Sequence, residues 1–96
     1  MTNENHPIKV FSPNEKFVIS LEAKPQSGFM WEIIEMSPIV SLIEEKVIPQ
    51  IGYMGSTQMF QFTTGLERGS GTLSFAYKRS WATEPLRTAT FQIQVV

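Results

Sequence analysis

Few side chains in this sequence could take part in catalysis. There is one histidine, His6, in a polar N-terminal tail, and there is no aspartate and no cysteine. A Ser-His-Asp triad, a histidine-based metal site and a thiolate nucleophile therefore cannot be assembled. Glu44 and Glu45 are the only adjacent acidic residues, and in a strand they would point to opposite faces rather than form a catalytic pair. We predict a protein that is not an enzyme and that needs neither a cofactor nor a metal.

Binding of another protein is the chemistry that the remaining residues favour. Large apolar side chains occur within or at the edge of three turn-like segments, 24–28, 49–56 and 80–86, where loops normally carry polar residues. Contiguous apolar patches on a surface tend to mark interaction sites. Trp81 lies close to Arg79, and Trp and Arg are both enriched among residues that dominate interface energies.

Proline and glycine give these segments particular backbone properties. Pro25 fixes its own φ and restrains the residue before it, while Gly28 permits a positive φ, so segment 24–28 should be stiff before it binds. Gly52 and Gly55 leave backbone N–H and C=O groups uncovered, so a partner could approach them closely.

Composition limits the other classes of partner. The 96 residues are 42% hydrophobic and 18% charged with a net charge of −1, which predicts one globular domain spanning 1–96 and disfavours nucleic acid and membrane surfaces as partners. No signal peptide or membrane span is visible. We expect a monomer, cytoplasmic for the sequence as written, or lysosomal or secreted if a leader was removed.

The segments between these turns predict the fold. Seven short stretches have β-rich composition, which is typical of an all-β, immunoglobulin-like antiparallel β-sandwich. The expected strands are 8–11, 16–23, 29–35, 40–48, 57–64, 71–79 and 87–96. The stretch 40–48 could also form a short helix.

Alternation of apolar and polar residues along these strands predicts the core. The expected core residues are Phe17, Ile19, Leu21, Ala23, Phe29, Trp31, Ile33, Phe60, Phe62, Leu73, Phe75, Tyr77, Phe91, Ile93 and Val95. Their neighbours Ser20, Glu22, Thr72, Ser74, Gln92 and Gln94 should face water. The indole N–H of Trp31 would need one hydrogen-bond partner.

Strand direction then places the loops. Successive strands run up and down, so 24–28, 49–56 and 80–86 should gather at one end, while the polar turns 12–15, 36–38 and 65–70 lie at the other. The apolar loop residues could form a binding surface. Alternatively, Trp81 and Tyr53 could fold back and plug the open end of the sandwich.

Taken in order, the three segments resemble motifs of the chagasin family of inhibitors of papain-like cysteine proteases, which are NPTTG followed by a hydrophobic residue, any residue and Trp, then GxGG, then RPW. The matching stretches are Lys24-Pro25-Gln26-Ser27-Gly28-Phe29-Met30-Trp31, Gly52-Tyr53-Met54-Gly55 and Arg79-Ser80-Trp81. This sequence departs from the motifs at Lys24, Gln26, Ser27, Met54 and Ser80. The resemblance covers nearly the whole chain.

The resemblance implies a reversible, competitive inhibitor of a papain-like, cathepsin-type (clan CA) cysteine protease. Loop 24–28 would enter the active-site cleft over the nucleophilic cysteine, with loops 49–56 and 80–86 flanking it. The implied protease-binding residues are Pro25, Gln26, Ser27, Gly28, Phe29, Gly52, Tyr53, Met54, Gly55, Arg79, Ser80 and Trp81. The alternative is an immunoglobulin-like recognition or adhesion module that uses the same loops for a different partner.

Overall fold

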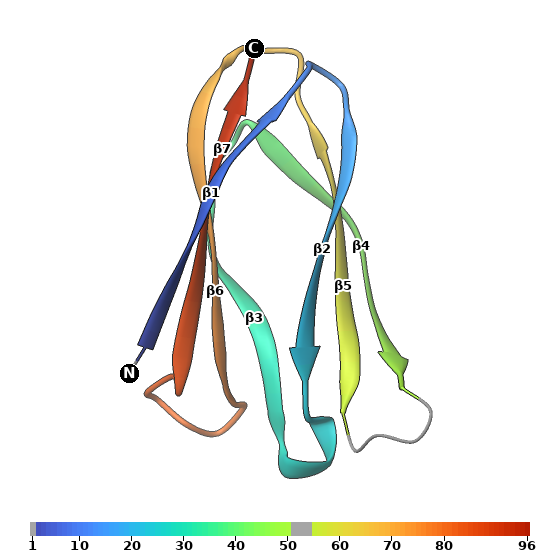
Figure 1. Ribbon diagram of the computed structural model, residues 1–96, viewed down its shortest axis with the longest axis vertical. Helices are drawn as coiled ribbons and strands as arrows, with labels where there is room; N and C mark the ends of the chain where they lie inside the picture. The colour runs from blue at the N-terminus through green and yellow to red at the C-terminus, as the bar shows by residue number, and fades with distance from the viewer. Residues whose placement is uncertain (1, 51–54) are drawn as a thin grey trace.

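The computed structural model describes residues 2–50 and 55–96, and these form two β-sheets packed face to face (Figure 1). The strands are β1 (Thr2–Phe11), β2 (Lys16–Ala23), β3 (Phe29–Met36), β4 (Val40–Pro49), β5 (Ser56–Thr64), β6 (Gly69–Arg79) and β7 (Arg87–Val95). A 3₁₀ helix, η1 (Pro25–Ser27), lies between β2 and β3. The predicted seven-stranded sandwich is confirmed.

Strand order and strand direction define the two sheets. One sheet has the order β1-β7-β6-β3 and the other the order β2-β5-β4. The pairs β7–β6, β6–β3, β2–β5 and β5–β4 are antiparallel as expected, whereas β1 pairs with β7 in parallel. Residues 40–49 form β4 along the edge of the second sheet, so the helical alternative for this stretch is wrong.

The first strand is longer than predicted. It begins at Thr2 rather than at residue 8, and its polar half pairs with β7 from Thr2 opposite Arg87 onward. An edge strand gains its hydrogen bonds through the backbone, so it needs no apolar alternation to form. The His6 ring stacks on Phe91 with centroids 4.1 Å apart, which fastens this segment to the first sheet.

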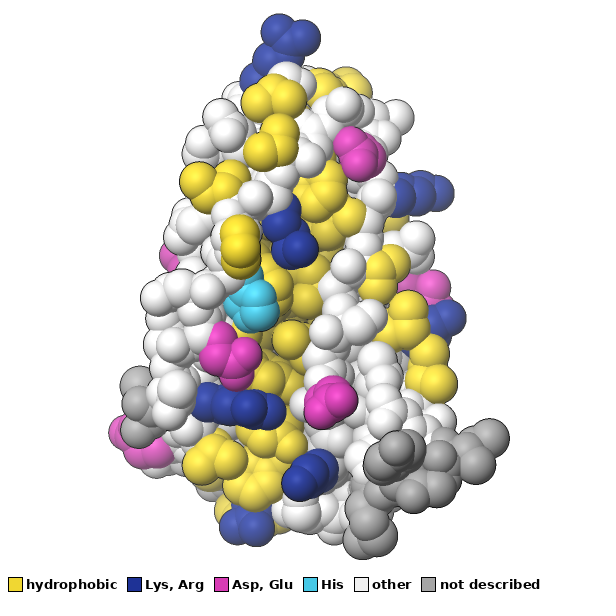
Figure 2. All heavy atoms as spheres, in the orientation of Figure 1, with side chains coloured by type: hydrophobic (Ala, Val, Ile, Leu, Met, Phe, Trp, Pro, Cys, Tyr) yellow, Lys and Arg dark blue, Asp and Glu magenta, His cyan; other side chains and the backbone are white. Residues whose placement is uncertain are grey.

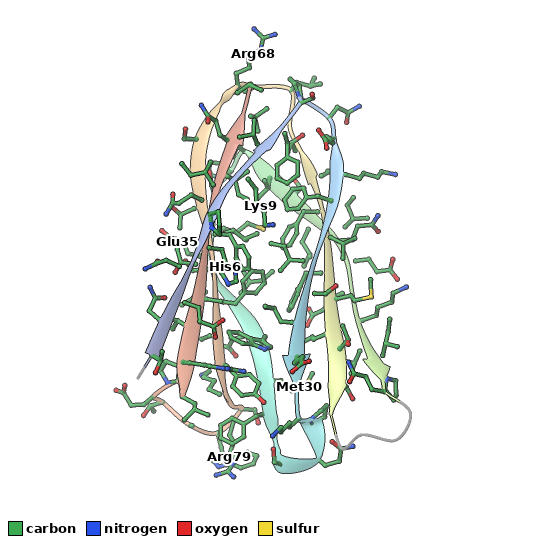
Figure 3. The ribbon with its side chains drawn as sticks, viewed as in Figure 1. His6, Lys9, Met30, Glu35, Arg68 and Arg79 are labelled. Atoms are coloured by element: carbon green, nitrogen blue, oxygen red, sulfur yellow. The ribbon has the colours of Figure 1, made fainter. Side chains whose placement is uncertain are left out.

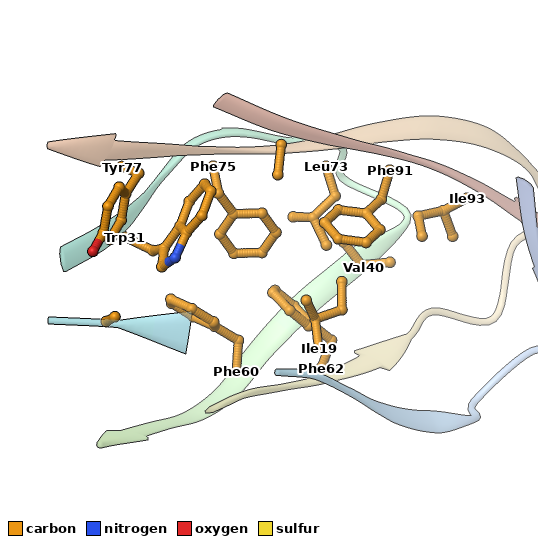
Figure 4. Close-up of a cluster of buried hydrophobic side chains, with 12 residues drawn as sticks. Ile19, Trp31, Val40, Phe60, Phe62, Leu73, Phe75, Tyr77, Phe91 and Ile93 are labelled. Carbon is orange, nitrogen blue, oxygen red and sulfur yellow. The ribbon is translucent and has the colours of Figure 1, made fainter. Parts of the chain in front are cut away.

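Aromatic rings fill the space between the two sheets (Figure 4). Phe75 is fully buried and contacts Phe60 at a centroid distance of 4.8 Å and Phe91 edge-on at 5.7 Å. Such pairs add about 0.5–1.5 kcal/mol beyond the area that they bury. The predicted core is confirmed, although Phe17, Leu21, Phe29 and Ile33 are only partly buried against it.

Ser74 is the exception among the positions expected to face water. It is buried because β6 lies inside its sheet, where side chains of both neighbouring strands cover it. Its hydroxyl lies 3.3 Å from Glu35 Oε1 and 3.4 Å from Thr90 Oγ1, which satisfies the buried group.

Trp31 and Gln58 join the two sheets near the start of β3. The buried Trp31 donates its indole N–H to the carbonyl oxygen of Glu22 at 2.8 Å. This bond confirms that the indole has the hydrogen-bond partner that we expected. The Gln58 amide accepts a hydrogen bond from the Trp31 backbone N–H at 2.9 Å and donates one to the Trp31 carbonyl at 2.7 Å. These bonds fix the position of β3, and with it the loop that precedes this strand.

Candidate protein-binding site

The β2–β3, β4–β5 and β6–β7 connections leave the sandwich at one end, the lower end in Figure 1. Gln50 and Gly55, which flank the undescribed part of the middle connection, line one groove together with Lys24 and Arg87. Loops 24–28 and 80–86 and the described ends of 49–56 therefore lie at one end, as predicted. Three of the predicted site residues, Gly52, Tyr53 and Met54, lie outside the described residues.

Loop 24–28 is a closed turn built around η1. Gly28 N–H donates to the Pro25 carbonyl at 2.9 Å, and Ser27 N–H donates to the Lys24 carbonyl at 3.0 Å. Lys24 and Phe29 pair across the base of the turn through hydrogen bonds of 3.2 and 3.3 Å. Gly28 has φ 87°, a left-handed conformation that other residues rarely adopt. The backbone of the loop is therefore fixed without a partner.

The side chains of this turn differ in what they offer to a partner. The Ser27 hydroxyl donates to the Lys24 carbonyl at 2.9 Å and so helps to hold the turn. Gln26 is exposed, and its amide makes no hydrogen bond with residues 2–50 or 55–96. Gln26 therefore has free donors and an acceptor beside the tip of the loop.

The β6–β7 loop is also ordered by local hydrogen bonds. Ala82 N–H donates to the Arg79 carbonyl at 3.0 Å, and Leu86 N–H donates to the Tyr77 carbonyl at 2.8 Å. Trp81, which belongs to this loop, is 73% exposed. An indole that exposed does not close the sandwich, so the plug interpretation is wrong for Trp81, and Tyr53 lies outside the described residues.

Arg79 and Trp81 join this loop to loop 24–28. The Nε of Arg79 donates to the Ser27 carbonyl at 3.1 Å, and the guanidinium lies 4.6 Å from the centroid of the Phe29 ring. A Cβ atom on Gly28 would lie 2.8 Å from Cη2 of Trp81, so any other residue here would force the indole to shift. The two loops thus form one surface, with Arg79 at the lower end of the molecule in Figure 3.

The exposure of the predicted site residues is mixed. Gln26, Ser27, Arg79, Ser80 and Trp81 are exposed, whereas Pro25, Gly28, Phe29 and Gly55 are partly covered. Phe29 stacks on the buried Tyr77 with centroids 5.3 Å apart, so it connects this surface to the core.

Arg87 belongs to the same end of the molecule, and sequence reasoning missed it. Its guanidinium carbon lies 4.9 Å from the Tyr77 ring centroid and 5.4 Å from that of Trp31, within cation–π range. Arg87 pairs with Tyr77 in the β6–β7 register, and this pairing sets its position. Its signal in the sequence is only a basic residue at the start of a strand.

Within residues 2–50 and 55–96, no group of three His, Cys, Asp or Glu residues could hold a metal ion. Over the same ranges, no helix has the length and apolar character to cross a membrane.

Comparison with known proteins gives a family and a fold. The sequence profile described as Chagasin family peptidase inhibitor I42 matches residues 10–95. The fold is similar to the crystal structure of a cysteine protease inhibitor, EhICP2, from Entamoeba histolytica, with a TM-score of 0.83 and 23% identity over 99% of this chain and 95% of that one. The solution structure of amebosin is similar with a TM-score of 0.69 and 20% identity, covering 99% and 97% of the two chains. No curated protein matches the sequence.

Proposed function

The chain belongs to the chagasin family of peptidase inhibitors, and from this premise we propose that it is a reversible, competitive inhibitor of a papain-like cysteine protease. Membership in an inhibitor family agrees with the prediction that the chain is not an enzyme. A cysteine protease as the target class is supported by EhICP2, the cysteine protease inhibitor from Entamoeba histolytica whose fold this chain shares.

The observation that carries the proposal is the rigid turn at 24–28, held against an exposed tryptophan. In the proposed complex this turn enters the active-site cleft over the nucleophilic cysteine and blocks the substrate. The Gln26 amide, which makes no hydrogen bond with the described residues, could reach the walls of the cleft. No group of the turn needs to react with the protease, so inhibition is reversible and competes with substrate.

The other two loops grip the protease on either side of the turn. Loop 80–86 presents Trp81 as an aromatic anchor, and loop 49–56 takes the opposite side. The proposed protease-binding residues are Pro25, Gln26, Ser27, Gly28, Phe29, Gly52, Tyr53, Met54, Gly55, Arg79, Ser80 and Trp81. We propose that residues 1–96 act as a single domain and as a monomer, with one chain per protease molecule.

Preorganisation explains how so small a surface could bind tightly. Ordering a flexible side chain on binding costs about 0.5–1.5 kcal/mol, and a mobile loop adds the cost of its backbone. Here the turn is closed by its own hydrogen bonds, and Arg79 ties it to β6. Most of this cost is therefore met during folding rather than on binding.

Steady-state kinetics with several papain-like proteases and a small peptide substrate tests the proposal. The apparent KM should rise with inhibitor concentration while kcat stays constant, and titration should end at one inhibitor per enzyme. Gln26→Ala should weaken inhibition, whereas Leu66→Ala should not, because Leu66 is 81% exposed but lies at the opposite end. Unchanged activity of all these proteases at a large molar excess of the wild-type chain would refute the proposal.

A further inference from the structure

We propose that Lys24 and Arg87 form a receptor for a carboxylate, which takes an acidic side chain of the target protease beside loop 24–28. This inference rests on the proposed function and adds a specificity element to it. Both residues lie outside the set of protease-binding residues implied by the family motifs. They would select proteases that carry an aspartate or glutamate at the rim of the active-site cleft.

The receptor is a groove between loop 24–28 and the end of the β6–β7 loop. We call it the side groove; it has a volume of about 470 Å³ and is lined by Lys24, Ser27, Phe29, Tyr77, Leu86 and Arg87. Both charged residues in this lining are cationic. In Figure 2, Lys and Arg side chains border a hydrophobic patch at the lower end of the molecule.

Arg87 is held in place by two aromatic rings, and its hydrogen-bond donors have no partner among the described residues. The guanidinium lies over Tyr77 and Trp31, yet it makes no hydrogen bond within residues 2–50 and 55–96. Glu4 forms an ion pair with Arg87, but its Oε2 lies 3.6 Å from Nη1, which is longer than a hydrogen bond. A guanidinium in a fixed position with free donors is suited to bidentate binding of a carboxylate.

Lys24 supplies the second positive charge. Its backbone is fixed by the pairing with Phe29 at the base of the turn. Its side chain is exposed, and its ammonium makes no ion pair or hydrogen bond with the described residues. A carboxylate between Lys24 and Arg87 would therefore pair with the ammonium of Lys24 and offer Arg87 a closer partner than Glu4, which lies 3.6 Å from Nη1.

The surroundings favour an acidic side chain over a free anion. Phe29 and Leu86 line the same groove, and Leu86 is 57% exposed, so both can contact the methylene groups of an aspartate or glutamate. Glu22 is absent from the lining of the side groove, although it lines the adjoining groove that Lys24 and Arg87 also border. The site lies immediately beside the turn that we place in the cleft, where the rim of the protease would meet it.

Inhibition constants measured at two ionic strengths test this inference. Lys24→Gln and Arg87→Gln should each weaken inhibition about fivefold or more at about 20 mM salt, and much less at about 500 mM, because salt screens exposed charges. Arg68→Gln is the matched control, since it removes the same charge at the opposite end of the molecule (Figure 3). Arg87→Lys, which keeps the charge on this side chain, should retain more inhibition than Arg87→Gln.

A second measurement identifies the partner. Each acidic residue at the cleft rim of the inhibited protease is changed to its amide, and one such change should remove most of the effect of Arg87→Gln. The inference is overturned if Lys24→Gln and Arg87→Gln inhibit as well as Arg68→Gln, if their losses persist at high salt, or if no rim carboxylate couples to Arg87. Those results would leave inhibition by the wild-type chain intact, whereas loss of inhibition by the wild type itself would refute the proposed function instead.

Discussion

Replacing Trp81 with alanine should weaken inhibition at least tenfold and leave the fold intact. The indole is 73% exposed, and a tryptophan side chain has about 250 Å² of accessible surface, so about 180 Å² is free to contact a protease. Complete burial of that area would contribute at most about 4.5 kcal/mol at about 25 cal/mol per Å². Covering half of it gives about 2 kcal/mol, which corresponds to about a thirtyfold change in affinity.

The effect of Trp81→Ala on stability should be much smaller. Only about a quarter of the indole is covered in the free chain, chiefly against Gly28, so the free energy of unfolding should fall by no more than about 1–2 kcal/mol. The assay combines the inhibition constant against a papain-like protease with urea unfolding of the same preparation. Leu66→Ala serves as a control, since it removes another strongly exposed apolar side chain at the other end.

Two results would refute the reasoning about Trp81. An inhibition constant within about twofold of the wild-type value would mean that the indole stays in solvent in the complex. Unfolding of the Trp81→Ala protein would mean that the indole supports the sandwich after all. The first result would remove loop 80–86 as an anchor without excluding loop 24–28 as the inserted segment.

Three further substitutions separate the loop surface from the core. Gly28→Ala should weaken inhibition more than tenfold and lower the free energy of unfolding by about 1–2 kcal/mol, because φ at this position is 87° and the new methyl group would meet Trp81. Unchanged inhibition would contradict this close approach. Gln58→Met should lower the free energy of unfolding by about 2–4 kcal/mol, because two backbone groups of Trp31 lose their hydrogen-bond partners. A loss below about 0.5 kcal/mol in urea unfolding would show that these groups find other partners. Trp31→Ala should cost about 3–5 kcal/mol in the same experiment, and a well-folded, fully stable variant would mean that the ring is not part of the core.

Features that depend on local alternation could be predicted from the sequence. The strand pattern around Phe75 and Phe91 identified the buried faces, and up-and-down strand order brought three loops to one end. The requirement of Trp31 for a hydrogen-bond partner followed from its chemistry, although the partner itself, the carbonyl of Glu22, could not be named.

Features that depend on register or on packing between sheets could not be predicted. The burial of Ser74 follows from the central place of β6 in its sheet, and strand order is not visible in a sequence. The stacking of Arg87 on Tyr77 depends on the pairing of β6 with β7. The same holds for Gln58, a polar residue whose burial makes sense only once β3 is packed against β5.

A crystal structure of the chain bound to a papain-like protease tests the central claim most directly. We expect residues 24–28 to lie over the catalytic cysteine in the conformation of the free chain, with Trp81 buried on one side of the cleft. A complex in which the opposite end or a sheet face occupies the cleft, or in which residues 24–28 remain in solvent, would contradict the proposed mechanism.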